Sequence, residues 1–331
     1  MKKIAISIFL LTALFINSCK NYSIVVGKKE WVKLTYSNSS FTGQINPSAI
    51  FSEKSPYVNI SATNITTDTT ASSIDIILDG LSITNGKHNF KINKYTVSEC
   101  DGTNCANKDF HQQTEFNTTQ NSSLSEITAV LVLDVSTSLG GHVDDVKSYA
   151  KDFAKSILDK NSESHVAIVL FSENIDTLGF FDSSGISQIN SFIDGYTNYG
   201  SRTTLYGACK QGLNMLNNYS GVGFKTLIVF TDGGDNNTNN PDQVLSQIKS
   251  STIKRYAIGL DGTDFNKDNL KDIASSTENM FVAKKFEDLE GAFDEVSSLV
   301  NTIYKIKYSR SKQILSQAIE IKFEFEVEKI N

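Results

Sequence analysis

The run of residues 127–133, Ile-Thr-Ala-Val-Leu-Val-Leu, most limits what this chain can fold into. Such a nearly continuous apolar run predicts a parallel strand that is buried on both faces. A helical pattern follows it, with apolar side chains at three- and four-residue intervals over residues 143–158. A buried strand that leads directly into an amphipathic helix is typical of α/β proteins.

The same alternation of strand and helix continues to residue 303. Further strands are predicted at residues 166–171, 226–230, 254–258 and 280–283, and further helices at residues 186–193, 205–217, 241–249, 266–274 and 286–303. Parallel strands joined by helical crossovers form a doubly wound sheet with helices on both faces. We therefore expect residues 127–303 to form an α/β domain around a mostly parallel, Rossmann-like sheet.

The segments on either side have the period-two pattern of antiparallel strands. Residues 19–113 contain short alternating runs that end in turn residues, and residues 304–331 alternate apolar and charged side chains. A hairpin alone is only marginally stable, so we expect the C-terminal strands to pack on the N-terminal ones. The α/β domain would then be inserted in a smaller all-β domain built from both ends of the chain. The polar residues 114–126 are predicted to be a linker.

The N-terminus has the pattern of an export signal. Two lysines are followed by an apolar stretch over residues 4–16, which is too short to span a membrane. The stretch ends in Asn17-Ser18-Cys19, which resembles a bacterial lipoprotein signal that is cut before an acylated cysteine. The resemblance implies a signal peptide over residues 1–18 and a lipid on Cys19 that anchors the exported protein to the bacterial outer membrane or cell surface. Plain secretion with another cleavage site is the alternative.

The acidic balance of the chain argues against nucleic acid as a partner. The formal net charge is -6 and the sequence pI is about 5.3, so no basic surface is expected to displace counterions from a phosphate backbone.

Export permits disulfides, and two of the cysteines are spaced for one. Cys100 and Cys105 flank a turn-forming run and are predicted to pair. The alternative for this pair is a zinc site with His88 and His111. Cys209 falls in a helical pattern and is expected to be a buried thiol.

Oxygen-bearing side chains follow two of the predicted buried strands. Asp134, Ser136 and Ser138 occupy alternate positions after residue 133, and extended backbone points such positions the same way. Thr203 precedes a predicted helix, and Asp232 follows another buried strand. Ligands of doubly wound sheets bind beyond the carboxyl ends of the strands. Two carboxylates and three hydroxyl groups suit a hard divalent cation.

In order and context, these motifs resemble a von Willebrand factor A (vWA) domain with a metal-ion-dependent adhesion site (MIDAS). The resemblance covers residues 127–303. It implies that Ser136, Ser138 and Thr203 supply hydroxyl ligands and that the two aspartates act directly or through water. It also implies one Mg²⁺, or Mn²⁺ or Ca²⁺ in its place, whose open position takes a Glu or Asp of a partner protein. We expect a single metal because residues 139–142 lack the acidic side chains that hold a second cation in related integrin domains.

Other interpretations of these residues remain. Each could cap a helix, and residues 234–240 are expected to form a flexible loop rather than a calcium site. An enzyme would use Ser136 as nucleophile and His142 as base, but no G-x-S-x-G motif surrounds Ser136 and we expect no catalysis. The sequence therefore predicts a membrane-anchored, cation-dependent protein-binding module for adhesion or envelope assembly. The alternatives are a structural envelope subunit with a vestigial metal site and a non-catalytic subunit that positions a secreted enzyme's substrate.

Overall fold

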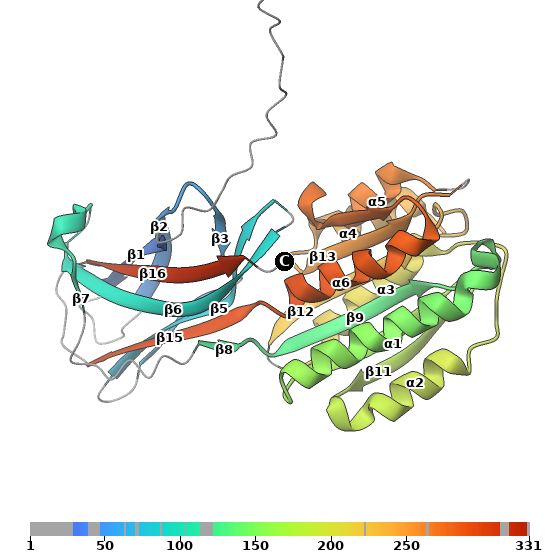
Figure 1. Cartoon of the computed structure of the whole chain (residues 1–331), viewed down its shortest axis with the longest axis horizontal. Helices are drawn as coiled ribbons and strands as arrows, with labels where there is room; N and C mark the ends of the chain where they lie inside the picture. Colours follow the sequence, from blue (N-terminus) through green and yellow to red (C-terminus); the bar gives the residue numbers. More distant parts are fainter. Residues whose placement is uncertain are drawn as a thin grey trace, which may run out of the picture.

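In the computed structural model, the chain forms two modules that lie side by side (Figure 1). The structure describes residues 29–38, 47–62, 64–69, 73–86, 88–102, 104–112, 122–221, 223–262, 265–311 and 318–329. The predicted signal peptide and Cys19 lie outside these residues, as does most of the predicted linker. We call strands β9 to β14 with their helices the α/β module, and all the other strands the β module.

The α/β module is built on a six-stranded sheet with the order β11-β10-β9-β12-β13-β14. Neighbouring strands of this sheet pair in parallel, except that β11 runs antiparallel to β10 at one edge. This confirms the predicted α/β fold with a mostly parallel sheet. The strands are β9 (Ile127–Asp134), β10 (His165–Phe171), β11 (Ile175–Phe181), β12 (Phe224–Thr231), β13 (Lys254–Leu260) and β14 (Met280–Ala283).

Helices cover both faces of this sheet because the side chains of each strand alternate between two cores. Leu131 and Leu133 of β9 pack with α1, α2 and α6, whereas Val130 and Val132 pack with α3, α4 and α5. Each such buried aliphatic side chain contributes about 1.5–3 kcal/mol. The helices are α1 (Val143–Lys160), α2 (Ile186–Asp194), α3 (Leu205–Asn218), α4 (Pro241–Ser250), α5 (Lys267–Ile273) and α6 (Leu289–Val300). Short 3₁₀ helices are η1 (Asn107–Asp109), η2 (Thr137–His142), η3 (Ser183–Gly185), η4 (Thr277–Asn279) and η5 (Phe286–Asp288).

The β module combines strands from before and after the α/β module. β16 pairs with β1 and β6, and β15 pairs with β5 and β8. β5 and β6 pair only beside their shared turn, so the sheet folds over and its two halves enclose one apolar core. The strands are β1 (Glu30–Asn38), β2 (Pro47–Lys54), β3 (Asn59–Ser61), β4 (Asn64–Thr69), β5 (Ser73–Asn85), β6 (His88–Asp101), β7 (His111–Gln112), β8 (Ser122–Leu124), β15 (Tyr304–Ser311) and β16 (Ile319–Lys329).

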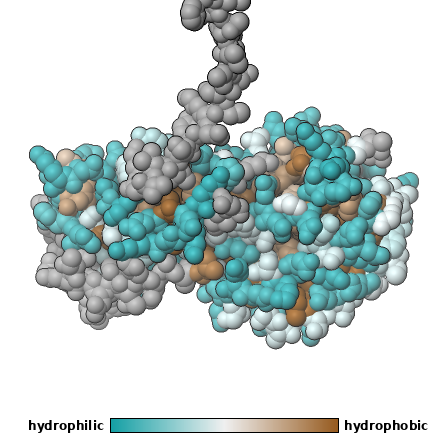
Figure 2. Space-filling model, in the orientation of Figure 1, coloured by the Kyte–Doolittle hydropathy of each residue, from teal (hydrophilic) through white to brown (hydrophobic). Residues whose placement is uncertain are grey.

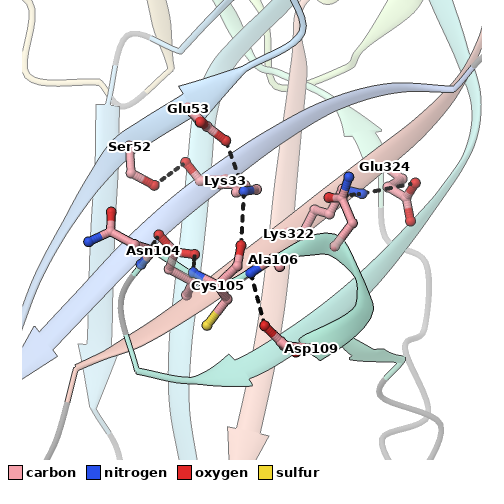
Figure 3. A network of polar contacts seen from close by, with 11 residues as sticks. Lys33, Ser52, Glu53, Asn104, Cys105, Ala106, Asp109, Lys322 and Glu324 are labelled. Atoms are coloured by element: carbon pink, nitrogen blue, oxygen red, sulfur yellow. Dashed lines mark hydrogen bonds and ion pairs between the residues drawn. The ribbon is translucent and has the colours of Figure 1, made fainter.

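Cys100 and Cys105 are joined by a disulfide, with their Cα atoms 6.5 Å apart. The loop that it closes is held against β16, where the carboxylate of Glu320 accepts hydrogen bonds from the backbone nitrogens of Asn104 (3.1 Å) and Cys105 (2.9 Å). Lys33 of β1 donates to the carbonyl of Cys105 at 3.4 Å, and Figure 3 shows this network. The alternative zinc site does not form, because both thiols are in the disulfide and His88 lies at the opposite end of β6 from Cys100.

The face of the molecule drawn in Figure 2 is mostly polar. On this face, hydrophobic residues are scattered among hydrophilic ones. Over the described residues, no helix combines the length and the apolar character that crossing a bilayer requires.

Candidate metal site

Four of the five predicted metal ligands lie where β9 and β12 end, in the centre of the α/β sheet. The two strands pair in parallel up to Leu133 and Phe230, which brings Asp134 and the residues after Phe230 to the same edge. β9 leads into α1 on one face of the sheet, whereas β12 is reached from α3 on the other face. The site is therefore at the topological switch point of the sheet, where the chain connections of neighbouring strands lie on opposite faces. The two loops diverge there and leave room for a ligand.

Four of the five predicted ligands form a continuous chain of hydrogen bonds. The backbone nitrogen of Ser136 donates to Oδ1 of Asp134 at 3.0 Å. The hydroxyl oxygens of Ser136 and Ser138 are 2.8 Å apart, and the Ser138 hydroxyl donates to Oδ1 of Asp232 at 3.0 Å. Asp134 is 0% exposed and Asp232 is 8% exposed, whereas Ser138 is exposed. Hydrogen bonds thus connect the two buried carboxyl groups to the exposed Ser138 hydroxyl.

Thr203 belongs to a neighbouring loop and joins this group only indirectly. Its backbone nitrogen donates to Oδ1 of Asn236 at 2.7 Å, and its carbonyl accepts from the backbone nitrogen of Asn236 at 3.0 Å. The same loop contacts the serine motif, because the backbone nitrogen of Thr137 donates to the carbonyl of Gly200 at 3.0 Å. Within the described part of the chain, the Thr203 hydroxyl makes no hydrogen bond, so it remains able to coordinate a cation.

The electrostatics of the site favour a cation. Burial, and after it the nearby charge of Asp232, raises the pKa of Asp134 from its ordinary 3.8 to about 7, against the lowering effect of hydrogen bonds from Ser136 and Thr231. No basic side chain is among the main influences on this pKa. A fully buried carboxyl group beside a second acidic side chain is costly to ionise, and a divalent cation would relieve this cost. The residues present therefore fit the metal.

Thr231 is a site residue to which the sequence analysis gave no role. Its hydroxyl donates to Oδ2 of Asp134 at 2.7 Å and lies 3.1 Å from the backbone nitrogen and carbonyl of Gly233. Asp134 is thus held from both sides, by Ser136 and by Thr231. A polar residue directly after the apolar run of residues 227–230 was the available signal.

The loop over residues 234–240 is tied to its surroundings, whereas the sequence analysis expected it to be flexible. Asp235 accepts hydrogen bonds from the backbone nitrogen of Tyr206 (3.0 Å) and from Thr238 (2.5 Å), and so holds the start of α3. Asn236 holds Thr203, as described above. The loop therefore positions a predicted ligand.

The arrangement does not assemble a nucleophile and a base. His142 stacks on Phe286, with ring centroids 3.8 Å apart, and its Nδ1 lies 3.2 Å from Oδ2 of Asp145. The Ser136 hydroxyl instead contacts Ser138. In the described ranges, no cluster of three or more His, Cys, Asp or Glu side chains could hold a metal. The candidate site differs from such clusters because hydroxyl groups make up most of its donors.

Comparison with known proteins identifies the domain. Residues 129–295, half of the chain, match the von Willebrand factor type A domain. No curated protein sequence matches the chain. Among solved structures, proximal thread matrix protein 1 from the mussel byssus is 25% identical over 58% of this chain and 50% of that chain, with a TM-score of 0.46. One structure of that protein has a zinc-occupied MIDAS motif.

Two further similar structures come from pili. The vWF domain of the type V pili tip protein Mfa5 from Porphyromonas gingivalis is 17% identical over 54% of this chain and 96% of that chain, with a TM-score of 0.45. The pilus adhesin SpaC from Lactobacillus rhamnosus GG is 12% identical over 88% of this chain and 44% of that chain, with a TM-score of 0.47. This chain spans about half the length of the mussel protein. The domain match shows that the chain belongs to the von Willebrand factor type A domain family.

Proposed function

We propose that the chain binds a partner protein through one divalent cation held at the ends of β9 and β12. The observation that carries this proposal is the hydrogen-bonded chain from Asp134 through Ser136 and Ser138 to Asp232, which links two buried carboxyl groups. When bound, Mg²⁺ or a similar cation would supply an electrophilic position for a Glu or Asp of the partner.

The residues of the chain make that position selective for an external carboxylate. Ser136, Ser138 and Thr203 would offer neutral hydroxyl oxygens, so they would leave much of the cation's charge uncompensated. Asp134 would be kept in place by the Ser136 backbone nitrogen and the Thr231 hydroxyl. Such a site recognises a partner and involves no bond making or breaking, so we assign no catalytic activity.

The β module would support the binding domain at a membrane surface. We propose that the chain is exported, that residues 1–18 are removed, and that a lipid on Cys19 anchors it to a bacterial outer membrane or cell surface. The α/β domain over residues 127–303 would be inserted in a β domain built from residues 19–113 and 304–331, joined by residues 114–126. The pairing of β15 and β16 with earlier strands supports this organisation.

Metal-linked stability and metal-linked binding together test the proposal. At 100 times its dissociation constant, Mg²⁺ should stabilise the protein by about 2.7 kcal/mol, which raises Tm by about 5–11 °C for a domain of this size. Asp134→Ala should abolish this response, whereas Asp144→Ala, an exposed aspartate at the start of α1, should leave it intact. A pull-down from native envelopes should then retain a partner that EDTA elutes. A chain that does not respond to Mg²⁺ or Mn²⁺ would instead have a structural role.

A further inference from the structure

The segment between α2 and α3, residues 195–204, is held against α1 by one buried lysine. Lys147 lies in the second turn of α1 and is 5% exposed. Its Nζ donates to the carbonyl of Tyr196 and to the hydroxyl of Tyr199, at 2.9 Å each, and to the carbonyl of Asp194 at 3.5 Å. An ammonium group has three N–H donors, so this short stretch of chain supplies an acceptor for each of them.

The ammonium group of Lys147 is buried among neutral oxygen atoms. Over the described ranges, no carboxylate forms an ion pair with it, and the Asp194 carboxylate instead lies 2.7 Å from Nζ of Lys151. Burying an ammonium group is costly, and an aliphatic side chain of similar size would fill the same position of α1 at a lower cost. The charge is therefore explained by the segment that it holds rather than by packing.

Tyr199 completes a closed set of contacts. Its hydroxyl group accepts from Lys147 and donates to the carbonyl of Tyr196 at 2.9 Å. Its ring also lies over the ammonium group, with 5.4 Å between Nζ and the ring centroid. The hydroxyl group is thus fixed although the residue is 41% exposed. Three mutual contacts among Lys147, Tyr196 and Tyr199 therefore fix residues 196–199 against α1.

The fixed residues continue directly into the candidate metal site. Gly200 follows Tyr199, and its carbonyl accepts from the backbone nitrogen of Thr137, which lies between the two predicted serine ligands. Thr203 comes three residues later, and Asn236 holds it from the other side. Figure 1 shows the segment between α2 and α3 at the same end of the α/β module as the start of α1. Lys147 thus anchors one end of the segment that carries a predicted ligand.

We propose that Lys147 is a positioning residue of the metal site, which fixes residues 195–204 so that Thr203 keeps its place next to the serine motif. The role rests on the metal-dependent function proposed above. Mg²⁺ requires nearly octahedral oxygen ligands at about 2.0–2.1 Å, whereas Ca²⁺ accepts more varied arrangements at about 2.3–2.6 Å. A looser segment should therefore weaken the binding of Mg²⁺ more than that of Ca²⁺.

Calorimetric titration of the full chain with Mg²⁺ and with Ca²⁺ tests this role. Lys147→Met keeps the length and the apolar stem of lysine without the charge. It should weaken Mg²⁺ binding about tenfold or more, as loss of a group that orients a metal ligand does, and Ca²⁺ binding by less than about threefold. Lys151→Met is the matched control, because Lys151 lies one turn further along α1 and forms an exposed ion pair. It should bind both cations like the unmodified chain.

Amide hydrogen exchange in EDTA measures the positioning in the absence of metal. Lys147→Met should speed the exchange of the backbone amides of Gly200 and Thr203 about tenfold and leave those of α3 unchanged. Lys151→Met should change neither. A variant that only destabilised the whole fold would speed exchange in every helix and weaken both cations equally.

Tyr199→Phe is a milder second variant, because it removes one of the three acceptors of Lys147 and keeps the ring. It should weaken Mg²⁺ binding about threefold and speed the same amides in the same direction. Circular dichroism reports whether Lys147→Met is folded. If it is not, Tyr199→Phe alone decides.

Three results would overturn the proposal. The first is unchanged Mg²⁺ affinity in the deciding variant, the second is an equal loss of Mg²⁺ and Ca²⁺ affinity, and the third is unchanged exchange at Gly200 and Thr203. Each of these, with Mg²⁺ bound by the unmodified chain, would refute the role of Lys147 alone. Binding of neither cation by the unmodified chain would refute the metal-dependent function and this role with it.

Discussion

Replacing Asp134 by asparagine should have opposite effects on the metal-free and the metal-bound protein. Without metal, Asp134 is a fully buried carboxylate whose pKa is raised from 3.8 to about 7 by burial and by Asp232. An asparagine side chain resembles the neutral, protonated form of the Asp134 carboxyl group. Its Oδ1 can accept from the Ser136 backbone nitrogen, and its Nδ2 can donate to the Thr231 hydroxyl, which then donates to the Gly233 carbonyl 3.1 Å away. The hydrogen bonds survive while the buried charge is removed.

The size of the stability difference between Asp134→Asn and the unmodified chain follows from the pKa of Asp134. A folded-state pKa above the unfolded value means that ionisation destabilises the fold, so the cost is absent below about pH 4, grows as the pH rises and is complete above pH 7. The difference between 3.8 and about 7, at about 1.4 kcal/mol per pH unit, gives an upper limit of about 4 kcal/mol. At pH 8 in EDTA, Asp134→Asn should therefore be more stable than the unmodified chain by about 2–4 kcal/mol, and equally stable near pH 4.

Urea unfolding at pH 4, 6 and 8, in EDTA and in Mg²⁺, measures both effects. In EDTA the difference between the two proteins should grow with pH, and in Mg²⁺ only the unmodified chain should gain stability. Asp144→Asn is the matched control, because this aspartate is exposed beside the site and should change stability by less than about 0.5 kcal/mol. If Asp134→Asn destabilised the metal-free protein at pH 8, the argument from an uncompensated buried charge would be refuted.

Three further changes test other parts of the structure. Thr231→Val removes a hydrogen bond to a carboxylate and should weaken Mg²⁺ binding about tenfold or more in calorimetry; an unchanged affinity would remove Thr231 from the site. Cys105→Ser opens a short loop and should lower the free energy of unfolding of the β module by roughly 2 kcal/mol in urea without altering Mg²⁺ binding, and a lost Mg²⁺ response would contradict the separation of the modules. Gly212→Ala places a Cβ 2.6 Å from Leu227 and should destabilise by about 1–3 kcal/mol, whereas Gly291→Ala meets nothing within 4 Å and should be neutral or stabilising; equal melting temperatures would contradict this.

The sequence predicted the α/β module well because its signals are local. A strand such as β9 is buried on both faces, so its sequence is a nearly continuous apolar run, and each helix carries its apolar stripe within a few turns. The antiparallel β11 was not predicted, because as an edge strand it is only partly buried and its Gly179 interrupts the alternation. β8 was not predicted either, because it lies in a polar stretch and forms a strand only by pairing with β15, about 180 residues away in the chain.

The candidate metal site and the junction between the modules differ in how much of them a sequence can reveal. Most of the candidate metal site lies in short stretches after buried strands, where spacing alone orients the side chains, so four of its five predicted ligands could be placed together from the residue pattern. The junction between the modules has no such pattern. Asn89 and Leu299 are 210 residues apart in the chain, and they share a hydrogen bond only because the turn between β5 and β6 packs against the end of α6. A motif predicts a site when short stretches at the ends of buried strands supply its residues, whereas a junction between modules depends on the packing that brings distant residues together.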